Sequence, residues 1–482
     1  MAYAGFLLPL LILAQSYTLI RERHFFAGTA LHETPTCSAY DGEGRLFIGG
    51  HALPTAAGLP DGWLVSLSAQ GEVLWRLTLG GLGPERITDL ALDDSVVYFC
   101  GSSGSALNHP EELPLERRSD YWVGAVHKHT GRLLWQARWG SPLPDEALSL
   151  CLTTYHGLLV VGYTWGVPET TMQATIFLLN TVTGEVRERR VWGPAPSLLR
   201  KVRPISGTGL YVCIGEQAYK PVVGALDYTG QIIWRTVLQR YPLPSALYAL
   251  YGSTEGQIWV GGRYGTRWCL LALEPTAGRV VREYIWPESS PTGALSALTE
   301  GAEGVLFAIG WIFSTTLQSP EQKGGEDIWL VAFAKEGKVL WERGFGGPQD
   351  ERGIALLVLP SGLALIAAKE NRFSEHPANA DSWVLLLKQV PCAEIPLTLR
   401  TDAPSFREKA GKPIRFWVEA PAEYSLSKVV WDFGDGSTAE GLEVSHIYGM
   451  TGTYTVRSTC YLHHGCAAGI DLPPILLRIT RP

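Results

Sequence analysis

Short apolar runs alternate with turn-forming residues from residue 41 to residue 388, in an order that recurs about every fifty residues. One recurring run is a short apolar strand ending in glycine, which suits a tight turn between strands. Its six copies occupy residues 46–49, 98–101, 159–162, 212–215, 258–261 and 307–310, and a seventh copy at 365–368 has no glycine. The run is β-branched and aromatic, so we expect a buried strand at each copy.

Two further runs follow each copy in a fixed order. The first, often opened by tryptophan, spans residues 63–65, 122–124, 176–178, 222–224, 268–270, 329–331 and 383–385. The second is a turn glycine leading into a strand, at residues 71–75, 131–135, 184–187, 230–234, 278–281 and 337–341. A fourth apolar strand, such as residues 87–92 or 354–359, opens the next copy. Four short strands repeated seven times predict a seven-bladed β-propeller, in which radial stacking buries both faces of every sheet.

The seventh copy lacks its last strand, because the chain reaches Pro391 soon after residues 383–388. Residues 17–28 stand alone near the start of the chain, and their pattern is that of the missing strand. We therefore predict that this N-terminal segment completes blade seven and closes the ring.

A longer motif joins the copies: Trp-x4-Gly-Gly, an acidic residue, two apolar strands, then Asp-x-Trp. It is clearest at residues 341–351, and the Asp-x-Trp part recurs at Asp61, Asp120 and Asp381. These repeats resemble those of secreted bacterial β-propeller repeat proteins, and the resemblance implies a non-enzymatic extracellular propeller. Copies three to five lack the aspartate.

Residues 391–482 have a different pattern and form a second predicted domain, after a propeller at 17–390. Three short motifs follow one another in order, with the residues Trp431, Asp432, Phe433, Gly434, Asp435, Gly436, His446, Tyr448, Gly452 and Tyr454. They closely resemble the signature of the PKD domain, an immunoglobulin-like β-sandwich. The resemblance implies a surface module for protein or glycan contact, or a rigid spacer, and no chemistry.

The first sixteen residues favour export. Residues 6–14 are apolar and small residues follow, as in a signal peptide that is removed at about residue 16. We find no apolar stretch long enough for a transmembrane helix. The net charge of -7 makes nucleic acid an unlikely partner. We expect a secreted or cell-surface bacterial protein.

The eight cysteines suggest little redox chemistry. Cys100 and Cys213 stand where other copies have core residues, which indicates buried thiols. Cys460 and Cys466 flank a short hairpin, so an exported protein would be expected to join them by a disulfide. Cys37 and Cys392 have no assignment.

Candidate metal ligands are sparse. His127 with His129 has no third ligand, and Asp432 with Asp435 is better explained by a turn. Acidic pairs at residues 145–146 and 350–351 recur at one blade position, which favours a structural role because an active site is normally unique. We expect no catalytic residue, metal or cofactor.

The predicted function is non-catalytic binding or adhesion, with an unknown protein or polysaccharide at the cell surface as partner. The longest loops, residues 51–60, 102–119, 311–326 and 371–380, should cluster on one face of the propeller and form its interaction surface. The alternative is a propeller glycosidase or lyase with an accessory PKD module, which needs paired carboxylates around the channel. A quinoprotein dehydrogenase is disfavoured because the chain has no adjacent cysteine pair.

Overall fold

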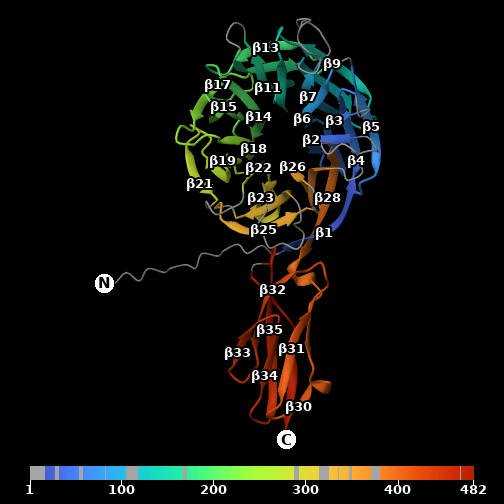
Figure 1. Ribbon diagram of the computed structural model, residues 1–482, viewed down its shortest axis with the longest axis vertical. Helices are drawn as coiled ribbons and strands as arrows, with labels where there is room; N and C mark the ends of the chain where they lie inside the picture. The colour runs from blue at the N-terminus through green and yellow to red at the C-terminus, as the bar shows by residue number, and fades with distance from the viewer. Residues whose placement is uncertain are drawn as a thin grey trace, which may run out of the picture. The chain divides into compact units, whose positions relative to one another are not determined.

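The computed structural model describes residues 17–27, 32–53, 58–81, 83–104, 118–166, 171–253, 255–286, 292–313, 325–334, 336–346, 350–370, 380–466 and 468–481. These residues form seven four-stranded sheets followed by a three-stranded and a six-stranded sheet. In Figure 1 the first strands of the blades, such as β6 and β18, surround the centre, and the last strands, such as β9 and β21, follow the rim. The prediction of a seven-bladed propeller followed by a β-sandwich is confirmed.

Each of the first six blades takes four consecutive strands, ordered from the centre to the rim. Blades one to three contain β2 (His32–Tyr40), β3 (Arg45–Leu53), β4 (Asp61–Ser68), β5 (Val73–Leu79), β6 (Glu85–Leu92), β7 (Val96–Ser103), β8 (Asp120–His127), β9 (Leu133–Trp139), β10 (Asp145–Leu152), β11 (Gly157–Trp165), β12 (Met172–Asn180) and β13 (Val186–Val191). Blades four to six contain β14 (Ser197–Ile205), β15 (Leu210–Gln217), β16 (Lys220–Leu226), β17 (Ile232–Val237), β18 (Ala246–Gly252), β19 (Ile258–Tyr264), β20 (Arg267–Leu273), β21 (Val280–Ile285), β22 (Gly293–Glu300), β23 (Leu306–Phe313), β24 (Glu326–Phe333) and β25 (Val339–Phe345).

Blade seven combines the two ends of the propeller sequence. Its sheet has the order β1-β28-β27-β26, where β26 is Glu351–Leu359, β27 is Gly362–Glu370, β28 is Ala380–Pro391 and β1 is Tyr17–Phe26. The backbone N–H of Ala27 donates to the carbonyl of Ser382 at 2.9 Å. The N-terminal strand therefore closes the ring, as the orphan pattern at residues 17–28 predicts.

Burial follows the position of a strand within its blade. The middle strands are apolar on both faces, and every residue of β24 is buried. The rim strands face solvent on one side, and β13 is almost wholly exposed. This difference explains why the middle runs read as continuous apolar segments and the last run carries polar residues.

A tryptophan on the rim strand fixes three neighbouring pairs of blades. The indole N–H groups of Trp75, Trp135 and Trp234 donate to carbonyls in the last turn of the next blade, at 2.9, 3.0 and 2.8 Å. Each ring also covers the turn glycine of that blade, as Trp135 covers Gly184, which has a φ of 72°. A Cβ there would overlap the indole, so this turn requires glycine for its shape and for space. Three of the turn glycines singled out in the sequence, Gly131, Gly184 and Gly278, have this role.

Residues beyond β28 form a two-sheet sandwich. One sheet has the order β29 (Thr398–Thr401), β31 (Pro413–Glu419) and β34 (Glu443–Ile447). The other has the order β30 (Arg407–Lys409), β37 (Ile475–Thr480), β35 (Gly452–Leu462), β32 (Leu426–Asp432) and β33 (Thr438–Glu440), with β36 (Ile470–Asp471) paired to β35. Its core includes Phe416, Trp431 and Val456, all fully buried. Alternating strand residues supply this core from both sheets.

The chain divides into two compact units, Arg23–Leu386 and Leu387–Pro482 with Met1–Glu22. Both division points fall inside strands, β28 and β1. The described helices are three-residue turns, η2 (Ala302–Gly304), η3 (Cys392–Glu394) and η4 (Pro404–Phe406). In the described part of the chain, no helix has the length and apolar character needed to cross a membrane.

Candidate binding cavity in the propeller channel

The first strand of every blade carries one β-bulge against the second strand. The register skips one residue in each pairing, and the skipped residues are Thr36, Thr88, Leu148, Arg200, Tyr248, Ser296 and Ile354. A bulge leaves its extra residue out of the ladder and redirects that side chain. All seven skipped residues line one cavity.

The bulge explains the glycine that recurs in the second strand. A Cβ on Gly101 or Gly162 would overlap the carbonyl oxygen of Arg86 or Glu146, two residues before the skipped residue. Gly50, Gly215, Gly262 and Gly310 hold the same position. In two copies the sequence pattern singled out the preceding residue instead, Gly49 or Gly261. All these glycines lie within strands, so the expectation that they form inter-strand turns is wrong. They leave room for the bent backbone of the first strand.

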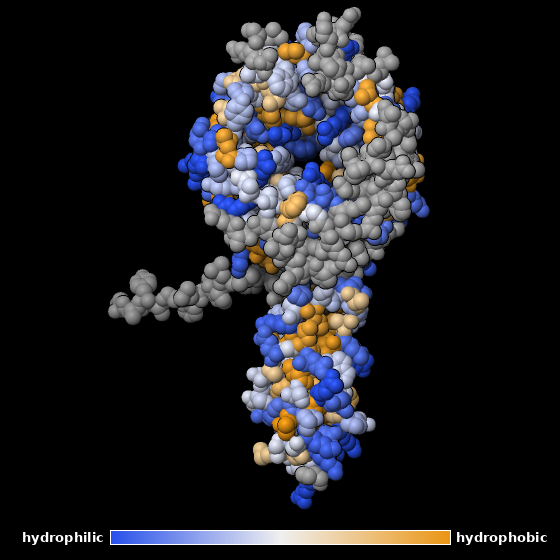
Figure 2. All heavy atoms as spheres, viewed as in Figure 1, coloured by the Kyte–Doolittle hydropathy of each residue, from blue (hydrophilic) through white to orange (hydrophobic). Residues whose placement is uncertain are grey.

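The cavity formed by the skipped residues has a volume of about 540 Å³ and lies in the channel of the propeller. Its remaining lining residues are Arg86, Glu146, Lys201, Ala294 and Trp311. Figure 2 shows the ring hollowed at its centre, with hydrophilic residues beside the opening. The volume is within the range of small-molecule sites in proteins.

Positive charge exceeds negative charge around the cavity. Arg86, Arg200 and Lys201 line it together with one carboxylate, Glu146, which accepts a hydrogen bond from the Tyr163 hydroxyl at 3.0 Å. The Arg200 guanidinium pairs with Glu216 at 2.7 Å and lies 5.3 Å from the ring centre of Tyr248. The Arg352 guanidinium lies 5.5 Å from the ring centre of Trp311, so both aromatic rings of the lining have an arginine neighbour.

A second cavity of about 260 Å³ shares Arg86 and Glu146 with the first. It adds the basic side chain of Arg118 and the imidazole of His51. Burial, and then the charge of Arg86, lowers the pKa of His51 to about 4, so this histidine is neutral at pH 7. The shared residues make the two cavities one polar surface.

Deeper in the channel, an ion-pair network joins three blades. Asp89 of blade two is 1% exposed and accepts two hydrogen bonds from the Arg203 guanidinium of blade four, at 2.8 and 2.9 Å. The Ser149 hydroxyl of blade three also donates to Asp89, and Lys201 lies 3.8 Å away. Burial alone would raise the pKa of Asp89, but the charges of Arg203 and Lys201 lower it to about 2. The network fixes the channel wall below the cavity.

These cavity residues were not predicted from the sequence, because their residue types vary around the ring. A spacing signal was present nonetheless. Each skipped residue lies three positions after a recurring polar or small residue, namely Glu33, Glu85, Asp145, Ser197, Ser245, Gly293 and Glu351. This alignment also shows that Asp145 corresponds to Glu351. The sequence pattern instead aligns Asp145 with Asp350, so the expected correspondence of the acidic pairs is off by one residue.

The signature residues of the C-terminal sandwich come together around one turn. Gly434 and Gly436 have φ values of 76° and 93°, as expected for the predicted tight turn. Asp432 and Asp435 accept backbone N–H groups of Gly434 and Ser437, at 2.9 and 3.0 Å. These bonds support the structural explanation of the two aspartates.

Aromatic contacts hold the other signature residues. The His446 ring stacks on Phe433 with centres 4.1 Å apart, and its Nε2 lies 2.7 Å from Asp435 Oδ2. The Tyr448 hydroxyl donates to the Phe433 carbonyl at 2.9 Å, and its ring lies 4.4 Å from that of Tyr454, which follows Gly452 at the start of β35. Trp431 donates to the carbonyl of Gly441 at 2.8 Å. The signature therefore fixes a turn against the core.

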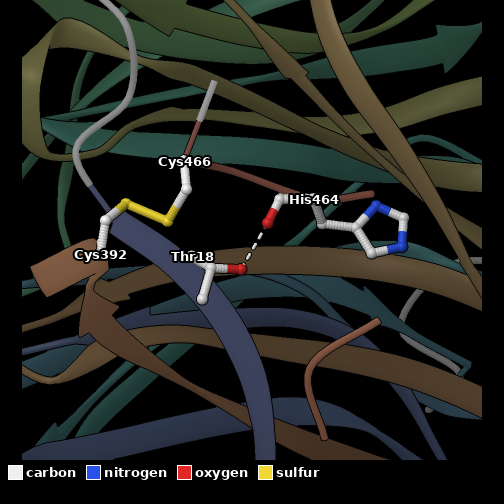
Figure 3. The surroundings of a disulfide bond; sticks show 4 residues. All are labelled: Thr18, Cys392, His464 and Cys466. Carbon is white, nitrogen blue, oxygen red and sulfur yellow. Dashed lines mark hydrogen bonds between the residues drawn. A yellow bond between two sulfur atoms is a disulfide. The ribbon is translucent and has the colours of Figure 1, made fainter. Parts of the chain in front are cut away.

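The predicted disulfide between Cys460 and Cys466 is wrong. Cys466 is bonded to Cys392, which lies 74 residues earlier in the sequence (Figure 3). A hairpin does form beside Cys460, but its register sets Cys460 opposite Ile470 and leaves Cys466 in the loop. The Cys460 side chain points into the core and is fully buried. Beside the disulfide, the Thr18 hydroxyl donates to the carbonyl of His464.

The remaining expectations divide between confirmed and untested ones. Cys100 and Cys213 are free and fully buried, as predicted. No three His, Cys, Asp or Glu side chains within the described ranges converge as metal ligands, and His127 instead contacts Thr130. The segment 1–16 and most of the long loops at 51–60, 102–119, 311–326 and 371–380 lie outside the described residues.

Comparison with known proteins identifies the second domain. Residues 404–471 match the family model described as "PKD domain". This part of the chain is a PKD domain. No curated protein matches the chain.

Two solved structures are similar to the propeller. A protein of unknown function from Bacteroides caccae is 17% identical, covers 61% of this chain and 94% of its own, and gives a TM-score of 0.38. The Dos1 propeller is 10% identical, covers 76% of this chain and 95% of its own, and gives a TM-score of 0.44. Because both TM-scores are below 0.5, the fold is assigned from the seven four-stranded sheets of this chain and not from these likenesses.

Proposed function

We propose that this protein is a secreted, non-catalytic binding protein whose propeller channel holds an acidic part of a surface polysaccharide. The observation that carries the proposal is the cavity of about 540 Å³, to which every blade contributes one skipped residue, with threonine occurring twice and five other types once. The second-strand glycines that pack against the bulges recur from blade to blade, whereas the residue types that line the cavity vary. Such a difference is expected when the scaffold is repeated and the lining serves one ligand.

The lining favours an anionic, hydroxyl-rich ligand. Three basic side chains face one carboxylate, so a negatively charged group would be attracted into the channel. Arginine can hold a carboxylate through two parallel hydrogen bonds. Tyr248 and Trp311 offer faces on which a sugar ring can pack, and the threonine and serine residues offer hydroxyl partners.

Two features support an extracellular location. Disulfides such as Cys392–Cys466 are typical of proteins that fold in oxidising compartments. PKD domains are typical of extracellular proteins, and residues 1–16 have the pattern of a signal peptide. We propose that the PKD domain adds a second contact to protein or glycan, or acts as a spacer.

The enzyme alternative has less support. A propeller glycosidase needs two carboxylates flanking the scissile bond. Among the described residues that line the main cavity, Glu146 is the one carboxylate, and it is hydrogen-bonded to Tyr163. A binding role requires no second acid.

The proposal is tested by screening the mature chain on an array of neutral and acidic glycans, followed by calorimetry with the best acidic oligosaccharide. Arg200→Gln should weaken binding about tenfold, in keeping with the loss of one charged hydrogen bond. Tyr248→Ala should weaken it further if the sugar packs on that ring. Arg187→Gln, on the exposed rim strand β13, is the matched control and should leave affinity unchanged.

The competing functions give different results. Release of reducing ends or unsaturated sugars from the bound polysaccharide would establish an enzyme. Equal binding of neutral and acidic glycans, unaffected by Arg200→Gln, would exclude the channel as an anionic site. Binding confined to a protein partner would shift the function to the loop face.

A further inference from the structure

At six of the seven junctions between blades the structure describes the side chains at two characteristic positions, and these six junctions fall into two chemical classes. The first position is on the third strand of one blade. It lies two residues before the residue that pairs with the recurring glycine of the second strand. The second position is on the first strand of the next blade, three residues before the skipped residue. Junctions one–two, two–three and six–seven combine Asp61 with Glu85, Asp120 with Asp145 and Asp327 with Glu351. Junctions three–four, four–five and five–six combine Gln173 with Ser197, Lys220 with Ser245 and Arg267 with Gly293.

The second class supplies its own donors. The Lys220 ammonium donates to the carbonyl of Tyr241 at 2.5 Å, and the Arg267 guanidinium donates to the carbonyl of Trp286 at 3.2 Å. The Gln173 amide donates to the carbonyl of Gly193 and to the Ser197 hydroxyl. Each of these carbonyls lies just after a rim strand. At these junctions a nitrogen donor therefore occupies the position that carries an aspartate elsewhere.

The acidic class places carboxylates against the glycines that follow the rim strand. A Cβ on Gly140 would overlap the carboxylate of Asp120 and would lie 2.8 Å from Asp145 Oδ2. Asp61 and Glu85 approach Gly80 and Gly81 in the same way. At these two junctions the two carboxylates thus reach one short segment of chain from neighbouring blades, and at junction six–seven Asp327 approaches Gly346.

Junction six–seven shows that donors are missing. Asp327 is fully buried, and neither of its carboxylate oxygens has a hydrogen-bond partner. The carboxylates of Glu351 and Asp350 are charged neighbours of Asp327. Lys369 pairs with Glu351 at 2.7 Å, so one basic group faces three acidic ones. At junction one–two, Glu85 Oε2 is also buried without a partner.

We propose that Ca²⁺ binds between blades at the acidic junctions and takes the place that the nitrogen donors of Gln173, Lys220 and Arg267 fill at the other three. Paired carboxylates are hard oxygen ligands, which suit Ca²⁺, and main-chain carbonyls and water would complete its shell. Both oxygens of Asp327 and one oxygen of Glu85 are buried without a hydrogen-bond donor. Burial of a carboxylate in this state is unfavourable, so a bound cation would stabilise the ring. This inference departs from the expectation that the chain binds no metal, and it is independent of the channel ligand.

Calorimetry of the full chain, freed of metal by a chelator and titrated with CaCl₂, tests the proposal. We expect at least three bound ions and a melting temperature that rises by several degrees when Ca²⁺ replaces chelator. Asp327→Asn should remove one bound ion. Asp94→Asn, an exposed acid in a blade-two turn, is the control and should change neither the count nor the shift.

A transplant variant keeps the test valid if Asp327→Asn does not fold. Asp120→Lys with Asp145→Ser gives junction two–three the residues of junction four–five. This variant should fold, bind one ion fewer and lose part of the Ca²⁺-dependent stabilisation. The proposal is overturned if the wild-type chain binds no Ca²⁺, or if it binds Ca²⁺ and both variants keep the full count. It is also overturned if Asp327→Asn stabilises the metal-free protein and no Ca²⁺ effect exists, because the pair would then share a proton.

Discussion

The propeller and the PKD domain both join segments distant in sequence, but by different chemistry. The propeller closes through β1, which pairs with β28 by main-chain hydrogen bonds, and its described cysteines are buried free thiols. The PKD domain joins Cys392 to Cys466 covalently. The fraction of surface buried on folding rises with chain length, so a large ring depends less on covalent support than a small sandwich. The difference teaches that a large core allows closure by main-chain hydrogen bonds, whereas a small core favours a covalent cross-link.

Removal of residues 17–28 is the strongest way to break this comparison. Without β1, blade seven has three strands and Phe25 no longer covers Gly71 of blade one. The propeller should lose about 5 kcal/mol or more, comparable with the stability of a whole domain. Calorimetry should show its transition lowered or lost, while the PKD transition moves much less. An unchanged propeller transition would disprove closure by this strand.

Arg203→Met tests a polar connection within the ring. The variant leaves Asp89 buried without its main cationic partner, which should destabilise the propeller by about 3–5 kcal/mol. The folded pKa of Asp89, about 2, lies below its ordinary value of 3.8, so the pair stabilises the fold above pH 4 and this stabilisation is lost as the pH falls toward 2.

Denaturant unfolding at several pH values measures both effects of this substitution. In Arg203→Met the acid-dependent loss of stability should be smaller than in the wild-type chain. Arg187→Met on the exposed strand β13 serves as the control. Equal pH dependence in all three proteins would contradict the assignment.

The double variant Cys392→Ala with Cys466→Ala removes the covalent closure of the PKD domain. A cross-link of this kind contributes about 2–4 kcal/mol, largely by restricting the unfolded chain. Only the PKD transition should shift, and reduction of the wild-type protein should shift it equally. Cys460→Ala, which removes a buried free thiol, separates packing from cross-linking and should not abolish the effect of reducing agent.

Trp135→Phe is expected to give the smallest effect. The substitution keeps most of the ring over Gly184 but removes the indole N–H that donates to the carbonyl of Thr181. The propeller should lose about 1 kcal/mol, the typical net contribution of one hydrogen bond. A loss above about 3 kcal/mol in denaturant unfolding would mean that ring volume, rather than the hydrogen bond, is the main contribution.

Local pattern accounts for what could be predicted. The apolar runs, the turn glycine before each rim strand and the orphan strand at residues 17–28 depend on neighbouring residues, so seven blades and their closure follow from the sequence. The PKD signature residues likewise define a turn within a few positions. These features need no knowledge of how distant strands align.

Register between strands decides what could not be predicted. The bulge at Arg200 or Tyr248 becomes visible only when the first and second strands are paired, so the regular spacing of the cavity residues could not be recognised as a signal beforehand. The same holds for Cys466, whose partner is set by the meeting of Cys392 with the loop beyond β35. In both cases the decisive contact joins residues that are distant in the sequence.

The seven skipped residues have a practical consequence for engineering. Because they have no partner in the strand register and line the cavity, their side chains can be exchanged while the neighbouring glycines preserve the bent backbone. A combinatorial library restricted to these seven codons would vary ligand preference on a constant ring. The architecture thus separates a stable frame from a set of interchangeable recognition groups.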